Sequence, residues 1–126
     1  MIAKPGRLLV IDDEPDIARF IGQVAEELGY EVRVTTDPDD FKRGYDDFHP
    51  TVIVLDVVMP EVDGIELVKF LAQRNCSARI LVISGYAERY LDNTKTLGEA
   101  FGLQSITAMA KPVELPRLEE FLSAAR

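Results

Sequence analysis

Five side chains that could do phosphoryl or metal chemistry stand where apolar runs of this sequence end. Three are carboxylates, one is a hydroxyl and one is an ammonium group: Asp12, Asp13, Asp56, Ser84 and Lys111. Carboxylates gathered in a partly desolvated cleft repel one another, so one of them must take a proton or a cation must bind. Mg²⁺ suits a site that offers a few oxygen ligands and leaves room for water. The residue types therefore predict an Mg²⁺ site that also attracts a phosphoryl group.

The nucleophile of such a site has to be a carboxylate, because no cysteine or histidine follows an apolar run. A carboxylate can attack phosphorus and form an aspartyl phosphate. Asp56, at the end of the expected central strand, is the predicted nucleophile, with Lys111 supplying positive charge and Ser84 a hydrogen bond to a phosphoryl oxygen. Taken singly, Asp13 could cap a helix, Ser84 could lie in a turn and Lys111 could be a solvated charge. Because all of them stand at strand ends, a shared site for Mg²⁺ and phosphoryl transfer is favoured over these separate structural roles.

The spacing of apolar residues predicts an α/β fold. Short runs rich in β-branched residues, without alternation, are typical of strands buried on both faces of a parallel sheet. Strands are expected at 8–11, 31–35, 52–55, 80–83 and 105–110, and helical stripes at 17–28, 41–48, 67–71, 91–101 and 115–122. This alternation predicts one doubly wound sheet with right-handed crossovers. Ligands of such sheets bind beyond the carboxyl ends of the strands, where the five polar side chains would converge.

Composition narrows the classes of function. The chain has 126 residues, the size of one domain, and 22 acidic against 14 basic residues give a net charge of -8. That charge opposes direct binding to nucleic acid or to an anionic membrane, and no apolar stretch approaches membrane-spanning length. The single cysteine, Cys76, and a start unlike a leader sequence fit a reducing cytoplasm. A protein partner or a cationic ligand is expected.

Four motifs, in order along the chain, resemble a known family. They are "LLVIDDEPD", "VIVLDVVMPEVDG", "ILVISGY" and "AKP". Over essentially its whole length the chain is similar to the receiver domain of bacterial two-component response regulators, such as the stand-alone chemotaxis regulator. The resemblance implies one receiver domain over residues 1–126, with a five-stranded sheet in the flavodoxin-like order 2-1-3-4-5. It also implies that the protein is not an enzyme, apart from catalysing its own phosphorylation and dephosphorylation.

The resemblance also implies a role for each polar residue. Asp56 would accept the phosphoryl group from a sensor histidine kinase or a histidine phosphotransfer protein. Mg²⁺ would be bound by Asp13 directly, by Asp12 through water, by Asp56 and by the main-chain carbonyl of Val58. The family pairs the residues at Ser84 and Lys111 with the phosphoryl group, and makes the Lys111-Pro112 bond cis. The output surface would be the face formed by the fourth helix, fifth strand and fifth helix, which is also compatible with a homodimer.

Two features of the sequence depart from the family pattern. Receivers often carry an aromatic residue three positions before the lysine, where this chain has Ala108, so the usual aromatic switch cannot operate here. Tyr86, in "SGY", is the candidate to replace it. The interval from Ser84 to Lys111 is also longer than in the chemotaxis regulator, which predicts an extended fourth helix or loop.

Other functions share parts of this pattern. The chain could carry phosphate as an intermediate in a multistep phosphorelay. It could also be a receiver excised from a larger regulator, such as a cyclic-di-GMP phosphodiesterase. A flavodoxin-like or metal-dependent hydrolase domain is a third alternative, but the sequence has neither a glycine-rich phosphate loop nor a cluster of histidines.

Overall fold

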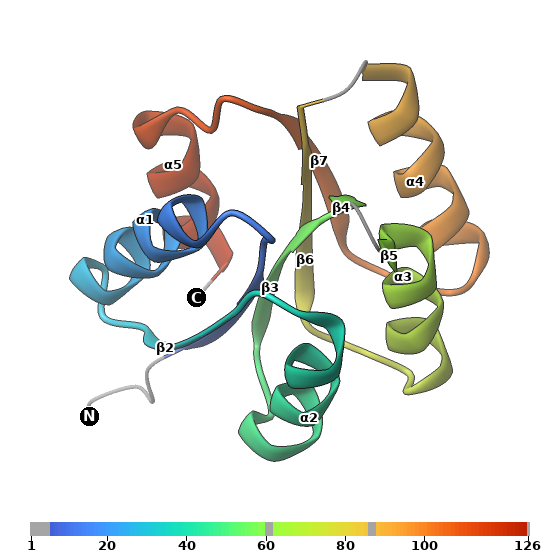
Figure 1. Cartoon of the computed structure of the whole chain (residues 1–126), viewed down its shortest axis with the longest axis horizontal. Coiled ribbons are helices and arrows are strands. Elements are labelled where there is room, and N and C mark those ends of the chain that lie inside the picture. Colours follow the sequence, from blue (N-terminus) through green and yellow to red (C-terminus); the bar gives the residue numbers. More distant parts are fainter. Residues whose placement is uncertain (1–5, 60–61, 86–87, 126) are drawn as a thin grey trace.

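Five parallel strands form the central sheet in this computed structural model, which describes residues 6–59, 62–85 and 88–125, without the side chains of 58, 59, 62, 63 and 88–92. The strands are β1 (Arg7–Ile11), β2 (Glu31–Thr35), β3 (Val52–Asp56), β6 (Arg79–Ser84) and β7 (Ile106–Ala110). Their order in the sheet is β2-β1-β3-β6-β7 (Figure 1). Counted along the sheet's own strands this is 2-1-3-4-5, so the predicted doubly wound fold is confirmed.

Helices cover both faces of the sheet. They are α1 (Pro15–Glu27), α2 (Pro38–Phe48), α3 (Gly64–Gln73), α4 (Glu88–Ala100) and α5 (Leu115–Ala125). Helices α1 and α5 lie together on one face, and α2, α3 and α4 lie on the other (Figure 1). None of the helices in the described part of the chain is both long and apolar enough to cross a membrane.

Two hydrophobic cores hold these layers together, because successive side chains of a strand point to opposite faces. On β1, Leu8 packs into the core beneath α1 and α5, whereas Leu9 packs into the core beneath α2 and α3. All five residues of β3 are buried, as expected for the central strand. The edge strand β2 is mostly exposed, and this agrees with its weaker apolar pattern. Cys76 is part of the core beneath α2 and α3, at 6% exposure.

A two-stranded hairpin, which the sequence pattern did not predict, follows the central strand. It pairs β4 (Val58–Met59) with β5 (Val62–Asp63) in antiparallel orientation. The main chain of Val57 supports it from both sides: its N–H donates to the carbonyl of Ile83 at 3.1 Å, and its carbonyl accepts from the N–H of Gly64 at 3.3 Å. The hairpin thus begins and ends against the segment that carries Asp56.

Gly64 must be a glycine for a steric reason. A Cβ atom at this position would lie 2.3 Å from the Cα of Val57 and 2.7 Å from its carbonyl oxygen. Both neighbours are backbone atoms, so no side-chain rotation can relieve the overlap. The glycine therefore sets how closely the start of α3 approaches the residue after Asp56.

Substitution of Gly64 by alanine is expected to destabilise the fold by about 1–3 kcal/mol, the usual cost of overpacking. Urea unfolding, followed by circular dichroism, measures this change. Gly85→Ala is the matched control, because the nearest atom to a Cβ there is the Cδ of Lys111 at 4.0 Å. Equal stability of Gly64→Ala and Gly85→Ala would contradict the steric argument.

Candidate functional site

Three carboxylates meet at the carboxyl ends of β1 and β3. Asp12 and Asp13 directly follow β1, and Asp56 is the last residue of β3. Each of them offers a carboxylate oxygen within 4.8 Å of those of the other two. Asp12 and Asp56 are buried and Asp13 is partly exposed. The predicted convergence of these three residues is therefore present in the structure.

The register of the sheet brings the remaining strand ends to the same edge. Leu55 lies opposite Ile11, and Asp56 lies opposite Ile83, one residue before Ser84. Ser84 in turn pairs with Ala110, the residue before Lys111. The four neighbouring strands therefore end almost level, at the same edge of the sheet.

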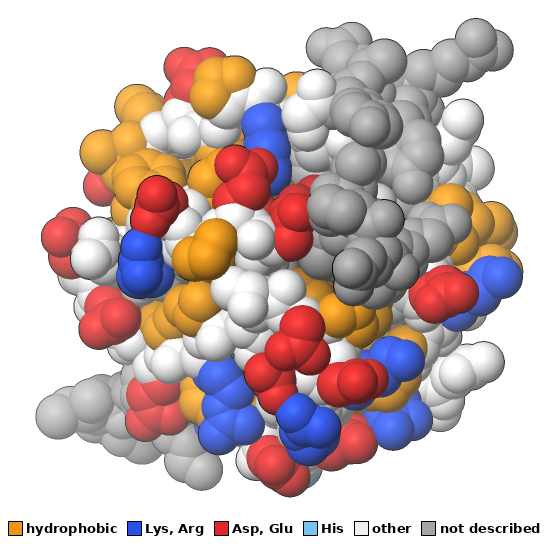
Figure 2. Space-filling view, viewed as in Figure 1, with side chains coloured by type: hydrophobic (Ala, Val, Ile, Leu, Met, Phe, Trp, Pro, Cys, Tyr) orange, Lys and Arg blue, Asp and Glu red, His pale blue; other side chains and the backbone are white. Residues whose placement is uncertain are grey.

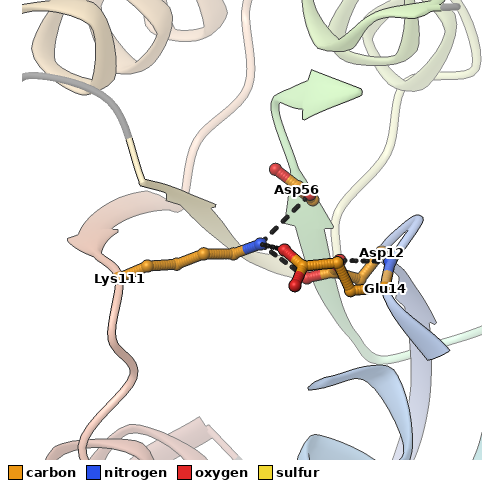
Figure 3. A network of polar contacts seen from close by, with 4 residues as sticks. All are labelled: Asp12, Glu14, Asp56 and Lys111. Atoms are coloured by element: carbon orange, nitrogen blue, oxygen red, sulfur yellow. Dashed lines mark hydrogen bonds and ion pairs between the residues drawn. The ribbon is translucent and has the colours of Figure 1, made fainter. Parts of the chain in front are cut away.

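Lys111 connects the carboxylates. Its Nζ atom lies 3.1 Å from Asp12 Oδ2, 3.2 Å from Glu14 Oε1 and 3.3 Å from Asp56 Oδ2. Figure 3 shows the lysine side chain extending from the end of β7 toward these acidic groups. Its backbone is held by a hydrogen bond of 2.8 Å from its N–H to the carbonyl of Ser84. A single ammonium group thus pairs with acidic residues from two strand ends and from the start of α1.

The acidic surroundings keep Lys111 charged. Burial is the largest influence and favours the neutral amine, but the attraction of Asp56 and the contacts with Asp12 and Glu14 outweigh it together. The pKa of Lys111 is therefore raised above its ordinary value. The lysine side chain is only 14% exposed, so water screens its contacts with the buried carboxylates of Asp12 and Asp56 weakly.

The Asp12 carboxylate is positioned by the backbone. Its Oδ1 accepts a hydrogen bond of 2.9 Å from the N–H of Glu14, and its own N–H donates to the carbonyl of Thr35 at 3.3 Å. Thr35 is fixed in turn, because its buried hydroxyl donates to the carbonyl of Val10 at 2.6 Å. These hydrogen bonds therefore fix the position of the Asp12 carboxylate, although the residue lies just outside β1.

This group of carboxylates fits a hard divalent cation. Within the described residues, the buried Asp12 Oδ2 makes no hydrogen bond and has the Lys111 ammonium as its ion-pair partner. A cation that prefers oxygen would complete the surroundings of this atom, and Asp13 and Asp56 add further oxygens nearby. The acidic group can therefore hold a metal ion.

The structure also describes three further predicted residues and the predicted cis bond. Ser84 is fully buried at the end of β6, and Val58 begins β4, one residue after Val57. The Lys111-Pro112 bond is cis, as the resemblance implies. Ala108 is half-buried on β7, and Tyr86 lies outside the described residues.

One residue of the site was missed. Glu14 has no role predicted from the sequence pattern, yet its carboxylate contacts Lys111. The adjacent acidic residues in "DDEPD" were the available signal, but a contact between residues 14 and 111 depends on how α1 begins and on where β7 ends. The spacing of residues along the chain reveals neither the start of α1 nor the end of β7 closely enough to predict this contact.

The comparison with protein families agrees with this geometry. Residues 8–123 match the response regulator receiver domain. The chain belongs to this family. Receiver domains take part in two-component signalling and are not conventional enzymes, and the acidic pocket of Asp12, Asp13 and Asp56 is the place of phosphorylation. Membership implies a histidine kinase as the class of partner.

Relatives with assigned functions include regulators and chemotaxis proteins. The chain is 33% identical over 106 residues to the alkaline phosphatase synthesis transcriptional regulatory protein PhoP of Bacillus subtilis, covering 84% of this chain and 42% of that protein. It is 26% identical to the regulatory protein AtoC of Escherichia coli, covering 94% of this chain and 25% of AtoC. It is 28% identical to the chemotaxis protein CheY of Treponema pallidum, covering 95% of this chain and 82% of CheY. The chain thus spans less than half of the first two relatives.

Solved structures show the same fold. The receiver domain of the Francisella response regulator 1452 is 28% identical and superposes with a TM-score of 0.76, covering 95% of both chains. A response regulator from Burkholderia pseudomallei is 27% identical with a TM-score of 0.77, covering 96% of this chain and 66% of that one. The latter structure contains a phosphorylated aspartic acid, a calcium ion and citrate.

Replacement of Lys111 by methionine is expected to destabilise the metal-free protein by about 2–4 kcal/mol at neutral pH, because buried carboxylates lose their cation. The raised pKa sets the pH dependence: the contribution is complete below about pH 10, where an unfolded lysine titrates, and is lost as pH rises through the folded pKa. Urea unfolding of both proteins in EDTA from pH 7 upward measures the difference.

The matched control for this change is Lys69→Met, on the exposed surface of α3. It removes the same charge and is expected to change stability by less than about 0.5 kcal/mol. A Lys111→Met protein as stable as Lys69→Met would show that the ammonium contacts contribute nothing.

Proposed function

We propose that this chain is a phosphoacceptor receiver in which Asp56 takes a phosphoryl group from a histidine kinase or a histidine phosphotransfer protein. The observation that carries the proposal is the position of the Asp56 carboxylate. It is buried at the end of the central strand, lies 3.3 Å from Lys111 Nζ, and has the carboxylates of Asp12 and Asp13 beside it. A nucleophile in these surroundings has both a cation-binding group and the positive charge of Lys111 next to it.

The chemistry is a transfer from nitrogen to oxygen. A carboxylate oxygen of Asp56 forms a bond to phosphorus, and the bond from phosphorus to the imidazole nitrogen of phosphohistidine breaks. The histidine takes a proton from water and leaves as neutral imidazole. Charge spreads over the phosphoryl oxygens during this step. Lys111 then neutralises one of these oxygens and the Ser84 hydroxyl donates a hydrogen bond to another.

We assign Mg²⁺ to the acidic group, with Asp13 and Asp56 as direct ligands, Asp12 acting through water, and the main-chain carbonyl of Val58 as a further ligand. Carboxylate and carbonyl oxygens with room for water are the ligands that Mg²⁺ prefers. When bound, the ion supplies positive charge that offsets the phosphoryl oxygens. Asp12 Oδ2 supports this assignment, because it is buried and makes no hydrogen bond within the described residues, with Lys111 as its ion-pair partner.

Residues 1–126 form the receiver in this proposal, and its output is a protein-binding surface made by α4, β7 and α5. Phosphorylation would shift the population of this surface between two states. Direct contact with nucleic acid is not part of the proposal, since the net charge is -8. Figure 2 supports this view on one face, where acidic side chains lie between Lys and Arg residues over α2 in the lower part of the picture.

A second candidate, the carrier of phosphate in a relay, is favoured by Ala108. The half-buried alanine, which lies opposite Val82 in the sheet, offers no ring that could turn inward. A phosphorylation-dependent change of the surface therefore has a weaker physical basis than in receivers with an aromatic residue there. Transfer of phosphate from Asp56 to a histidine phosphotransfer protein, faster than its hydrolysis, would favour the relay. A receiver detached from a larger regulator would give the same chemistry and differ only in its output.

Incubation with acetyl phosphate and Mg²⁺ is expected to add one acid-labile phosphoryl group to the protein. Intact-mass spectrometry under mild conditions measures the product. Asp56→Asn should remain unlabelled because the nucleophile is lost, whereas Asp47→Asn, on the exposed surface of α2, should label as the wild type does. Equal labelling of Asp56→Asn would place the acceptor elsewhere.

Mg²⁺ is expected to raise the thermal stability of the protein through the acidic group. At ten times its dissociation constant an ion stabilises the folded state by about 1.4 kcal/mol, which corresponds to an increase of about 3–6 °C in Tm. Asp13→Asn should lose this increase and Asp47→Asn should keep it. Differential scanning calorimetry in EDTA and in MgCl₂ distinguishes the two, and a full increase in Asp13→Asn would remove Asp13 from the ligand set.

A further inference from the structure

Glu14 shares the ammonium group that the proposed phosphoryl transfer needs. Its Oε1 atom accepts a hydrogen bond of 3.2 Å from Lys111 Nζ, a distance between those of Asp12 and Asp56 to the same nitrogen. Figure 3 shows the three acidic side chains around the end of the lysine. Glu14 differs from the other two because its side chain is 60% exposed and lies outside the group of metal-binding carboxylates.

The backbone of Glu14 is fixed firmly enough to aim this side chain. Its N–H donates to Asp12 Oδ1 at 2.9 Å, and its carbonyl accepts from the N–H groups of Ile17 and Ala18 at 3.1 Å. Glu14 is the N-cap residue of α1, and Pro15 follows it in the first turn. N-cap side chains commonly bond to the helix backbone, but that of Glu14 makes no such bond. It extends to Lys111 instead.

We propose that Glu14 is a positioning residue that retains Lys111 in the unphosphorylated state and so limits the rate of phosphorylation at Asp56. This inference rests on the proposed function. Before transfer, the ammonium group is divided among three carboxylates. A phosphoryl group on Asp56 adds negative charge and draws the lysine toward itself, so the contact with Glu14 weakens. Glu14 therefore stabilises the state that precedes transfer more than the state that follows it.

The size of the effect follows from exposure. Ion pairs with a solvent-exposed partner contribute little, and Glu14 is mostly exposed. Loss of the contact should accelerate phosphorylation about two- to fivefold. Salt screens exposed charges, so the difference between the variant and the wild type should shrink as NaCl is raised to about 0.5 M.

A negative charge near the site could also act without Lys111, by repelling an anionic phosphodonor. A double-mutant cycle separates the two explanations. If Glu14 acts through Lys111, Glu14→Gln has no effect once Lys111 is methionine. If it acts by repulsion, the acceleration persists in the Lys111→Met background.

The experiment measures the initial rate of labelling by acetyl phosphate in saturating MgCl₂ for the wild type, Glu14→Gln, Lys111→Met and the double variant. Glu27→Gln, at the exposed far end of α1, is the matched control for charge and should label at the wild-type rate. Acceleration by Glu14→Gln alone, lost in the Lys111→Met background, is the expected result. A wild-type rate in Glu14→Gln, or acceleration that persists without Lys111, would overturn the inference.

A second readout needs no phosphorylation. The same four proteins are unfolded with urea in EDTA, where the contact between Glu14 and Lys111 should appear as a coupling of about two- to fivefold in the folding equilibrium constant. Absence of this coupling would overturn the inference even if Lys111→Met labels too slowly for kinetics. Failure of the wild type to label at all would instead contradict the proposed function, so the two failures remain distinct.

Discussion

Compensation of negative charge at one edge of the sheet is the constraint on which this structure depends. Buried carboxylates at the ends of β1 and β3 are costly unless a cation is close to them. Lys111 provides that cation from the end of β7, two strands away from β3 in the sheet. The strand register has to be correct across β1, β3, β6 and β7 at once, because a shift of one residue would move a side chain to the other face of its strand.

The main chain does much of the positioning. Backbone groups of Glu14 and Thr35 hold Asp12, and the Val57 main chain ties the segment after Asp56 both to β6 and to the start of α3. Such contacts tolerate little adjustment, as the 2.3 Å approach at Gly64 illustrates. The main chain at Asp12 and after Asp56 is therefore held in place, and the most adjustable member of the site is the long side chain of Lys111.

The same lysine links stability to function. Its contacts with the carboxylates keep it charged and lower the cost of burying them. In the proposed phosphoryl transfer the same lysine turns toward a new anion. A group that stabilises the resting state too strongly would slow that change, so the balance among its acidic partners matters. This balance matters more because position 108 is an alanine. An aromatic ring there could turn inward when the site changes and so alter the surface, and Ala108 cannot do this.

Sequence alone determined the fold class, the strand order through the family resemblance, and the five polar residues at the strand ends. Buried strands leave near-continuous apolar runs, and a polar residue that follows such a run must stand at the edge of the sheet. The hairpin between Val58 and Asp63 was missed because two-residue strands have no periodicity to detect. The contact of Glu14 with Lys111 was decided only by the tertiary structure. It joins residues 97 positions apart, and their distance depends on the helix start, on the strand register and on the reach of two flexible side chains.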